Sequence, residues 1–167
     1  FLLSGVGHGE SKRAIYDMGV IFQKTSESLT DNADYRQAFY APYTCNGIQI
    51  CFATDRTEAL NDVTIYIYDS TEMLLGEYIV SHEQIQDNQY IDIFFEDFLL
   101  KEGNRYFFEA CILGEAPNPI RFWMGQTSSE FCMFVQYQGE LLENTSIAFN
   151  LIYEYTDGKF IAWLFVS

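Results

Sequence analysis

The residues of this sequence best suited to chemistry are aromatic side chains that lie beside amide and charged groups. Trp123 follows Arg121 by two residues, which places both side chains on one face of an extended segment, and Gln126 lies in the turn beyond them. Aromatic rings offer flat apolar surfaces to the C–H groups of sugars, while amide and guanidinium groups hydrogen-bond to the hydroxyls. These three residues therefore predict a carbohydrate-binding site.

Three tyrosines extend this prediction. Tyr66 and Tyr68 share one face of an expected strand, opposite its aliphatic face, and Tyr137 ends a further strand. Tryptophan and tyrosine also fill the cores of β-proteins and cover their sheets, so a structural role for each ring is the alternative.

A turn rich in oxygen ligands predicts a calcium site. Asp31, Asn32 and Asp34 form the densest such turn, and hard oxygen ligands of this kind suit Ca²⁺. Their spacing matches no known calcium loop. Aspartate and asparagine also populate turns simply by bonding to their own backbone, which is the alternative here.

Two glutamates on expected strands, Glu109 and Glu154, are the candidates for catalysis. Some small jelly-roll proteins hydrolyse glycosides with two carboxyl groups about 5 to 9 Å apart. Both glutamates alternate with apolar neighbours, which is equally typical of solvent-facing positions. The two histidines, His8 and His82, lie in a glycine-flanked segment and in a turn, where we expect surface positions. The sequence favours a protein without catalytic activity, with a small glycosidase as the enzymatic alternative.

The elements that must position these residues are β-strands. Aromatic residues make up 17% of the chain and fall in short alternating runs separated by turn-forming residues. The strands are expected at 14–23, 36–41, 47–53, 62–69, 74–80, 89–95, 105–113, 120–124, 130–138, 146–155 and 159–166. This pattern predicts an all-β fold, a single antiparallel β-sandwich of jelly-roll type with about ten strands. Ser81 followed three residues later by Gln84 fits a capping box and predicts the one short helical turn.

Length and charge limit the organisation and the partners. The 167 residues are expected to form one domain spanning 1–167, with 1–34 as a partly extended N-terminal arm. The chain carries 24 acidic residues against 9 Lys and Arg, a formal net charge of −15. Such a charge repels phosphate backbones and anionic lipid surfaces, so we expect no nucleic-acid partner, and membrane contact only through flanking segments.

The cysteines favour buried thiols over a metal site. Cys45, Cys51, Cys111 and Cys132 show no Cys-x-x-Cys spacing, which disfavours structural zinc. Cys51 and Cys111 lie in apolar strand patterns, where a free cysteine behaves as a small hydrophobic residue. A disulfide between neighbouring strands is the alternative.

The ends of the sequence suggest a piece of a longer protein. Residues 1–7 are too short and too rich in glycine for an intact signal peptide. The apolar run at 160–166 is about a third of the length that crosses a bilayer. We expect it to be a final strand, joined to the preceding strand by a turn at 156–159, with a strand leading into a membrane helix as the alternative.

Several segments follow an order found in a known group of domains. They are Arg36-Gln37-Ala38-Phe39-Tyr40-Ala41-Pro42, Gly47-Ile48-Gln49-Ile50-Cys51-Phe52-Ala53-Thr54 and Val63-Thr64-Ile65-Tyr66-Ile67-Tyr68-Asp69, continued by the segments 85–90, 103–108 and 120–123. They resemble the extracytoplasmic jelly-roll or galactose-binding-like domains appended to large bacterial membrane proteins, several of which are similar to glycosyltransferases or surface-polysaccharide enzymes.

This resemblance implies a non-catalytic accessory module located outside the cytoplasm or at the cell surface, and it supplies no catalytic residue. Together with the aromatic residues it favours weak carbohydrate binding. The alternative is a structural or protein-interaction domain that positions another part of the same protein and binds no small ligand.

Overall fold

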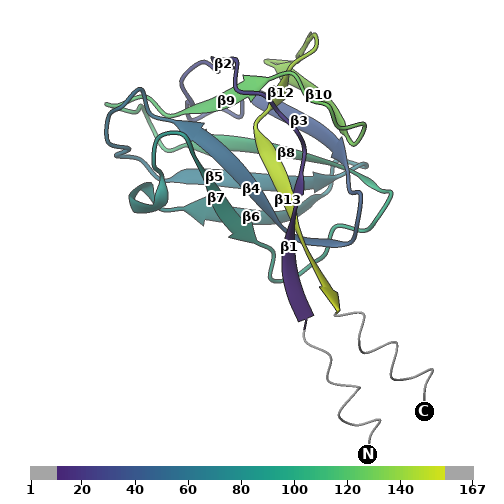
Figure 1. Cartoon of the computed structure of the whole chain (residues 1–167). Helices are drawn as coiled ribbons and strands as arrows, with labels where there is room; N and C mark the ends of the chain where they lie inside the picture. The colour runs from purple at the N-terminus through teal and green to yellow at the C-terminus, as the bar shows by residue number, and fades with distance from the viewer. Residues whose placement is uncertain (1–10, 157–167) are drawn as a thin grey trace, which may run out of the picture.

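The computed structural model describes residues 11–156 as two antiparallel β-sheets packed face to face (Figure 1). Within these residues there are thirteen strands, so the predicted antiparallel β-sandwich is confirmed with more strands than the ten expected. The expected strand 159–166 lies outside the described residues, as does most of the turn expected at 156–159.

One sheet has seven strands and the other has six. The seven-stranded sheet contains β1 (Ser11–Asp17), β2 (Lys24–Thr25), β4 (Cys45–Ala53), β7 (Gln89–Phe94), β9 (Arg121–Gly125), β12 (Ser146–Ile147) and β13 (Phe149–Thr156). The six-stranded sheet contains β3 (Tyr35–Tyr40), β5 (Val63–Asp69), β6 (Leu74–Val80), β8 (Arg105–Ile112), β10 (Cys132–Tyr137) and β11 (Glu140–Leu142).

Eight of these strands follow jelly-roll topology. The order β1-β13-β4-β7 in one sheet faces the order β3-β8-β5-β6 in the other, so consecutive strands repeatedly cross between the sheets. The strands β2, β9, β10, β11 and β12 extend this framework at one end. The jelly-roll expectation therefore holds for the framework.

The alternating sequence pattern sets the two faces of each strand. In β5, Val63, Ile65 and Ile67 are fully buried, whereas Thr64 and Tyr66 are half-buried on the outer face. Residues of both sheets join in one hydrophobic core cluster. At its centre the Phe149 ring lies 5.2 Å from the ring of Phe39 and 5.2 Å from that of Phe108, measured between centroids.

A buried glutamine also links the two sheets. Gln37 of β3 is 0% exposed, and its Oε1 accepts hydrogen bonds from the Ile147 amide at 2.8 Å and from the Ser146 hydroxyl at 3.3 Å. Its Nε2 donates to the carbonyls of Ala38 and Phe134. Because β12 belongs to the opposite sheet, this single side chain fixes one sheet against the other.

The first described residues pair with the last ones. From residue 11 onward the chain belongs to the sandwich: β1 pairs with β13 from Ser11 opposite Thr156 to Asp17 opposite Asn150, and Leu29 is buried. The strand expected over 14–23 already ends at Asp17. There Gly19 adopts a φ of +66° and donates its amide to the Asp17 carboxylate at 2.7 Å, which turns the chain.

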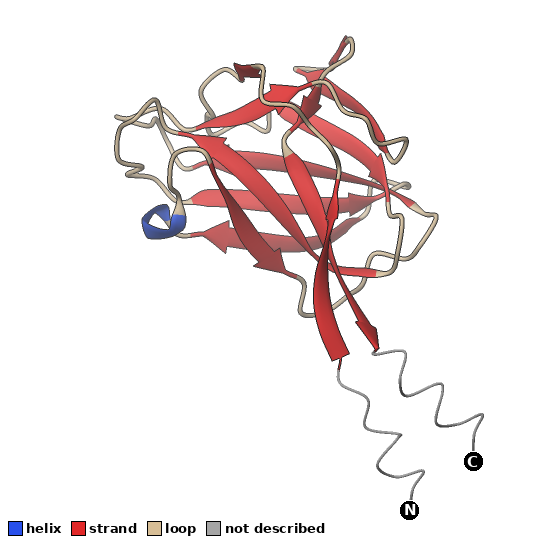
Figure 2. Ribbon diagram, viewed as in Figure 1, coloured by secondary structure: helices blue, strands red, loops and turns tan. Residues whose placement is uncertain are grey.

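Two further strands differ from the expected ranges. The strand expected over 146–155 is divided into β12 and β13 at Ala148, and the short β11 was not expected. The helical turn is confirmed as a 3-10 helix, His82–Gln84 (Figure 2). The capping box between Ser81 and Gln84 is present as well. Among residues 11–156 no helix has the length and apolar character needed to cross a membrane.

All four cysteines are free thiols, and three of them are buried, with Cys111 half-buried on the outer face of β8. Burial raises the pKa of Cys45 to about 11 and the pKa of Cys51 to about 12. At neutral pH both groups are therefore neutral apolar thiols, which suits their place in the sandwich.

The raised pKa of Cys51 predicts a loss of stability at alkaline pH. The pKa of a thiol in an unfolded chain is about 8.5. Above that pH the unfolded chain therefore loses a proton that folded Cys51 retains until about pH 12. The group should then lower the free energy of unfolding by up to about 1.4 kcal/mol per pH unit. Denaturant titrations of Cys51→Ala should show a slope against pH that is shallower by this amount between roughly pH 9 and 11. Below about pH 8 the two slopes should agree, and equal slopes at alkaline pH would contradict the prediction.

Candidate functional site

The environment of Trp123 is crowded by its neighbours. Trp123 lies on β9, and its ring stacks on Phe22 with centroids 5.3 Å apart and planes 10° apart. The indole Nε1 donates to the Oδ1 of Asn88 at 2.5 Å. One face of its ring and its donor are thus both engaged within the protein, and Phe22, 38% exposed, is the more accessible ring.

The polar partners predicted for Trp123 are held elsewhere. The Arg121 guanidinium pairs with the Asp55 carboxylate at 3.0 Å and donates to the carbonyl of Ser26 at 3.1 Å. Gln126 is exposed and lines a different hollow beneath the β10–β11 hairpin. Arg121 and Trp123 therefore do lie on one side of β9, as predicted, but their polar groups stabilise loops.

Tyr66 and Tyr68 occupy the outer face of the other sheet. There the Arg36 guanidinium lies over the Phe107 ring at 4.2 Å, pairs with Glu72 at 2.6 Å and reaches within 3.9 Å of Glu109. A hydrogen bond with the Cys111 thiol raises the pKa of Tyr66 to about 12. These groups form a layer of side chains over the sheet.

Tyr137 and the predicted calcium turn lie together at a third place. The Tyr137 ring packs on Tyr35 with centroids 4.6 Å apart, and the next residue, Gln138, donates its amide to the carbonyl of Asp34 at 2.7 Å. The Asp34 carboxylate accepts from the Thr30 hydroxyl at 2.8 Å.

Asp31 and Asn32 are exposed in the same turn. Within residues 11–156 no three His, Cys, Asp or Glu side chains gather to hold a metal ion. Calcium binding by Asp31, Asn32 and Asp34 stays a prediction.

The two carboxylates considered for catalysis do not approach one another. Glu109 lies on β8 in the six-stranded sheet, and Glu154 lies on β13 in the seven-stranded sheet. Glu154 accepts hydrogen bonds from Asn46 at 2.6 Å and from Ser11 at 3.2 Å. The two carboxylates thus belong to different sheets and have different partners.

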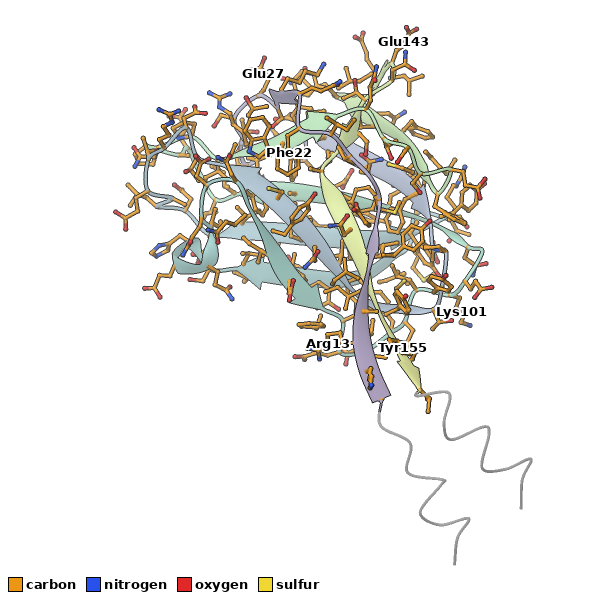
Figure 3. The ribbon with its side chains drawn as sticks, viewed as in Figure 1. Arg13, Phe22, Glu27, Lys101, Glu143 and Tyr155 are labelled. Carbon is orange, nitrogen blue, oxygen red and sulfur yellow. The ribbon has the colours of Figure 1, made fainter. Side chains whose placement is uncertain are left out.

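A groove lined by tyrosines lies at the end of the sandwich where β1 and β13 leave the body. We call it the tyrosine groove; it has a volume of about 520 Å³ and is lined by Ala14, Tyr43, Thr44, Glu102, Tyr153, Glu154 and Tyr155. The Tyr153 ring contacts Tyr43 at 4.6 Å and Tyr155 at 6.3 Å between centroids. Tyr43 is 44% exposed and Tyr155 is 48% exposed, so two rings offer open surface. Tyr155 lies at the end of β13 (Figure 3).

The chemistry of the tyrosine groove combines flat rings with hydrogen-bond acceptors. Its charged lining groups are the carboxylates of Glu102 and Glu154, with phenol and threonine hydroxyls between them. Ring faces suit the C–H surface of a pyranose, and carboxylates accept hydrogen bonds from its hydroxyls. Rings and acceptors therefore meet here in one hollow, which they do not around Trp123.

Sequence reasoning missed most of this groove. The alternation of Tyr153 and Tyr155 on β13 is the signal that could have indicated it, since two tyrosines two residues apart share a strand face. Tyr43 and Glu102 come from two loops, where no periodicity indicates which residues meet.

Comparison with known proteins identifies no family. No protein-family model matches the chain, and no curated protein matches it. Among solved structures the chain is similar to a chain in the structure of infectious bursal disease virus Gt strain, with a TM-score of 0.24 and 9% identity over 90% of this chain. The match spans 31% of the viral chain, and at this TM-score it carries no argument about function.

Proposed function

We propose that this domain is a non-catalytic accessory module that binds carbohydrate weakly through the tyrosine groove. The observation that carries the proposal is the convergence of Tyr43, Tyr153 and Tyr155 with two carboxylates in one open hollow. A sugar ring placed against the exposed faces of Tyr43 and Tyr155 would bury apolar C–H surface while its hydroxyls point toward Glu102 and Glu154.

Side chains of the tyrosine groove are held in place by their neighbours, which favours a ligand-binding site over side chains that are merely exposed. The Glu154 carboxylate is held by the Asn46 side chain at 2.6 Å, and Tyr153 is half-buried between Tyr43 and Tyr155. Groups that are fixed before binding lose little conformational entropy when the ligand arrives.

The attachment of such a module to a larger bacterial surface or membrane protein is part of the proposal. Ser11 and Thr156 are paired neighbours at the end of the β1–β13 ribbon, which projects from the body (Figure 1). A domain whose first and last described strands are paired with one another can be carried by another structure without distortion of either. The resemblance to extracytoplasmic accessory domains supports the same arrangement.

A second candidate function is docking of another protein part on the six-stranded sheet. Its edge strand β6 exposes Leu74 and Ile79, at 48% and 71%, and the preceding turn exposes Met73 at 63%. Apolar side chains on an unpaired strand edge favour a protein contact, in which case the domain would position a neighbouring part and bind no small ligand.

Titration of the 167-residue chain with neutral oligosaccharides, followed by NMR shifts of the tyrosine rings, tests the carbohydrate proposal. Wild type should bind at millimolar sugar, and Tyr155→Ala or Tyr43→Ala should each weaken binding by about tenfold, since each removes one stacking face. Tyr40→Ala is the matched control, because Tyr40 is similarly exposed, at 38%, and lies outside the groove.

Absence of binding across the panel at millimolar sugar would overturn the proposal and favour the docking function. A loss of affinity in Tyr40→Ala equal to that in Tyr155→Ala would remove the groove as the site. Repetition with calcium and with a chelator also tests the predicted site at Asp31, Asn32 and Asp34.

A further inference from the structure

A second cavity lies on the other side of the loop that borders the tyrosine groove. It has a volume of about 620 Å³ and lies between the start of β8, the end of β5 and the segment 98–104. Leu75, Phe98 and Tyr106 form an apolar wall, and Phe98 is fixed by stacking on the buried Phe95, with centroids 4.7 Å apart. Tyr106 belongs to the packed core, and Leu75 and Phe98 are partly buried side chains packed against it, so this wall has little freedom to move.

Two basic residues line this cavity. Lys101 and Arg105 both contribute to its lining, although the chain has only 9 Lys and Arg against 24 acidic residues. In the part of the chain that the structure describes, neither side chain has a carboxylate within 4.0 Å, whereas Arg36 and Arg121 are paired with Glu72 and Asp55. Two cations left unpaired beside one hollow in so acidic a protein are available for a negatively charged ligand.

Asp69, the one acidic residue of the lining, is hydrogen-bonded within its own turn. The Oδ1 of Asp69 accepts hydrogen bonds from the Thr71 amide at 2.9 Å, from the Thr71 hydroxyl at 2.7 Å and from the Met73 amide at 3.0 Å. The bond from Thr71, with that from Met73, lowers the pKa of Asp69, so its carboxylate is ionised at neutral pH. Two cations and one anion leave the lining with a net charge of one positive unit, which suits a ligand with one negative charge.

Neighbouring residues of the loop 98–104 place opposite charges in the two hollows. Lys101 lines this cavity, while the next residue, Glu102, lines the tyrosine groove. Arg105 at the start of β8 is half-buried and lies over the Phe107 ring at 5.3 Å, which limits the positions its guanidinium can take. An arginine held in this way can bind a carboxylate through two parallel hydrogen bonds.

We propose that this cavity binds a small carboxylate with an apolar ring face, the chemistry of an acidic sugar such as a uronate. The carboxylate lies between Arg105 and Lys101, the ring lies against Phe98 and Leu75, and the side-chain amide of Asn104 is placed for a ring hydroxyl. The proposal concerns a site separate from the tyrosine groove and does not rest on sugar binding there.

NMR titration of the 167-residue chain with sodium D-glucuronate, D-glucose and sodium acetate tests this proposal. Glucuronate should shift resonances of Phe98 and Tyr106, and it should bind more tightly than either other compound, since only glucuronate offers both the charge and the ring. Arg105→Gln should weaken glucuronate binding by about tenfold or more, because a hydrogen bond to a charged group is lost. Lys101→Gln should weaken it by less, and higher salt should weaken it in wild type.

Lys24→Gln is the matched control, since Lys24 is an exposed lysine on β2 in the other sheet, and it should leave binding unchanged. Arg105→Lys keeps the charge and should recover part of the affinity, which separates loss of charge from loss of fold. Glucose binding as tightly as glucuronate would overturn the role of the cations, and acetate binding as tightly would overturn the role of the apolar wall.

Absence of a shift at Phe98 or Tyr106 with glucuronate up to about 50 mM would overturn the site as a whole. Such a concentration is far above the dissociation constant of a specific small ligand. Ligands of the tyrosine groove shift Tyr43 and Tyr155 instead. The two proposals therefore fail independently.

Discussion

Replacement of Phe149 by alanine is expected to lower the free energy of unfolding by about 3–5 kcal/mol, the usual cost of removing a fully buried phenylalanine. Phe149 is 0% exposed, and its ring packs between those of Phe39 and Phe108, which belong to the opposite sheet. Removal of the ring loses its burial and leaves a cavity at the point where the two sheets meet, which rigid neighbours fill only in part.

Chemical denaturation followed by tyrosine and tryptophan fluorescence measures this loss. Phe149→Leu should cost clearly less, because leucine fills much of the same space. Phe22→Ala is the matched control, since Phe22 is 38% exposed and should cost less than the core replacement. A loss below about 1.5 kcal/mol for Phe149→Ala would show that the sheets close around the site, contrary to this account.

Replacement of Gln37 by leucine is expected to cost about 2–4 kcal/mol, although leucine has a similar size and is more apolar. The substitution removes both partners that Gln37 offers: the acceptor for the Ile147 amide and the donor to the carbonyls of Phe134 and Ala38. The Ile147 amide and the Ala38 carbonyl are buried and the Phe134 carbonyl is partly buried. An unsatisfied buried group carries the full cost of its lost hydration.

Amide hydrogen exchange identifies the cause of this loss. The Ile147 amide should exchange faster in Gln37→Leu than the change in global stability explains, because β12 loses its tie to β3. Gln136→Leu is the matched control: Gln136 is half-buried on the neighbouring β10, and its replacement should change stability by less than about 0.5 kcal/mol. An unchanged stability in Gln37→Leu would show that other groups replace its hydrogen bonds.

The two proposed sites present opposite charges on the two sides of one loop. The tyrosine groove presents the carboxylates of Glu102 and Glu154, and the neighbouring cavity presents Lys101 and Arg105. A domain built in this way would select neutral sugars on one side and acidic sugars on the other. The calcium and carbohydrate hypotheses are each tested by a separate readout of the experiments above, and absence of sugar binding would favour the docking hypothesis.

The sequence alone determined the class of fold because its signal is local. Residues such as Val63, Ile65 and Ile67 alternate with Thr64 and Tyr66, and the two-residue period of a strand places them on opposite faces whatever the neighbouring strands are. The capping box at Ser81 and Gln84 is equally local, since both bonds close within four residues. Strand boundaries failed where a turn interrupts an apolar run, as at Gly19, because the run itself does not indicate the turn.

Which of these residues meet depends on the tertiary structure. Trp123 and Tyr66 both belong to outward faces, yet they lie on different sheets, because strand order depends on long-range pairing that no short pattern records. The same pairing brings Tyr43 from one loop and Glu102 from another to Tyr153 and Tyr155 on β13. A strand pattern fixes which face a side chain occupies, whereas the site depends on which faces and loops the fold places together.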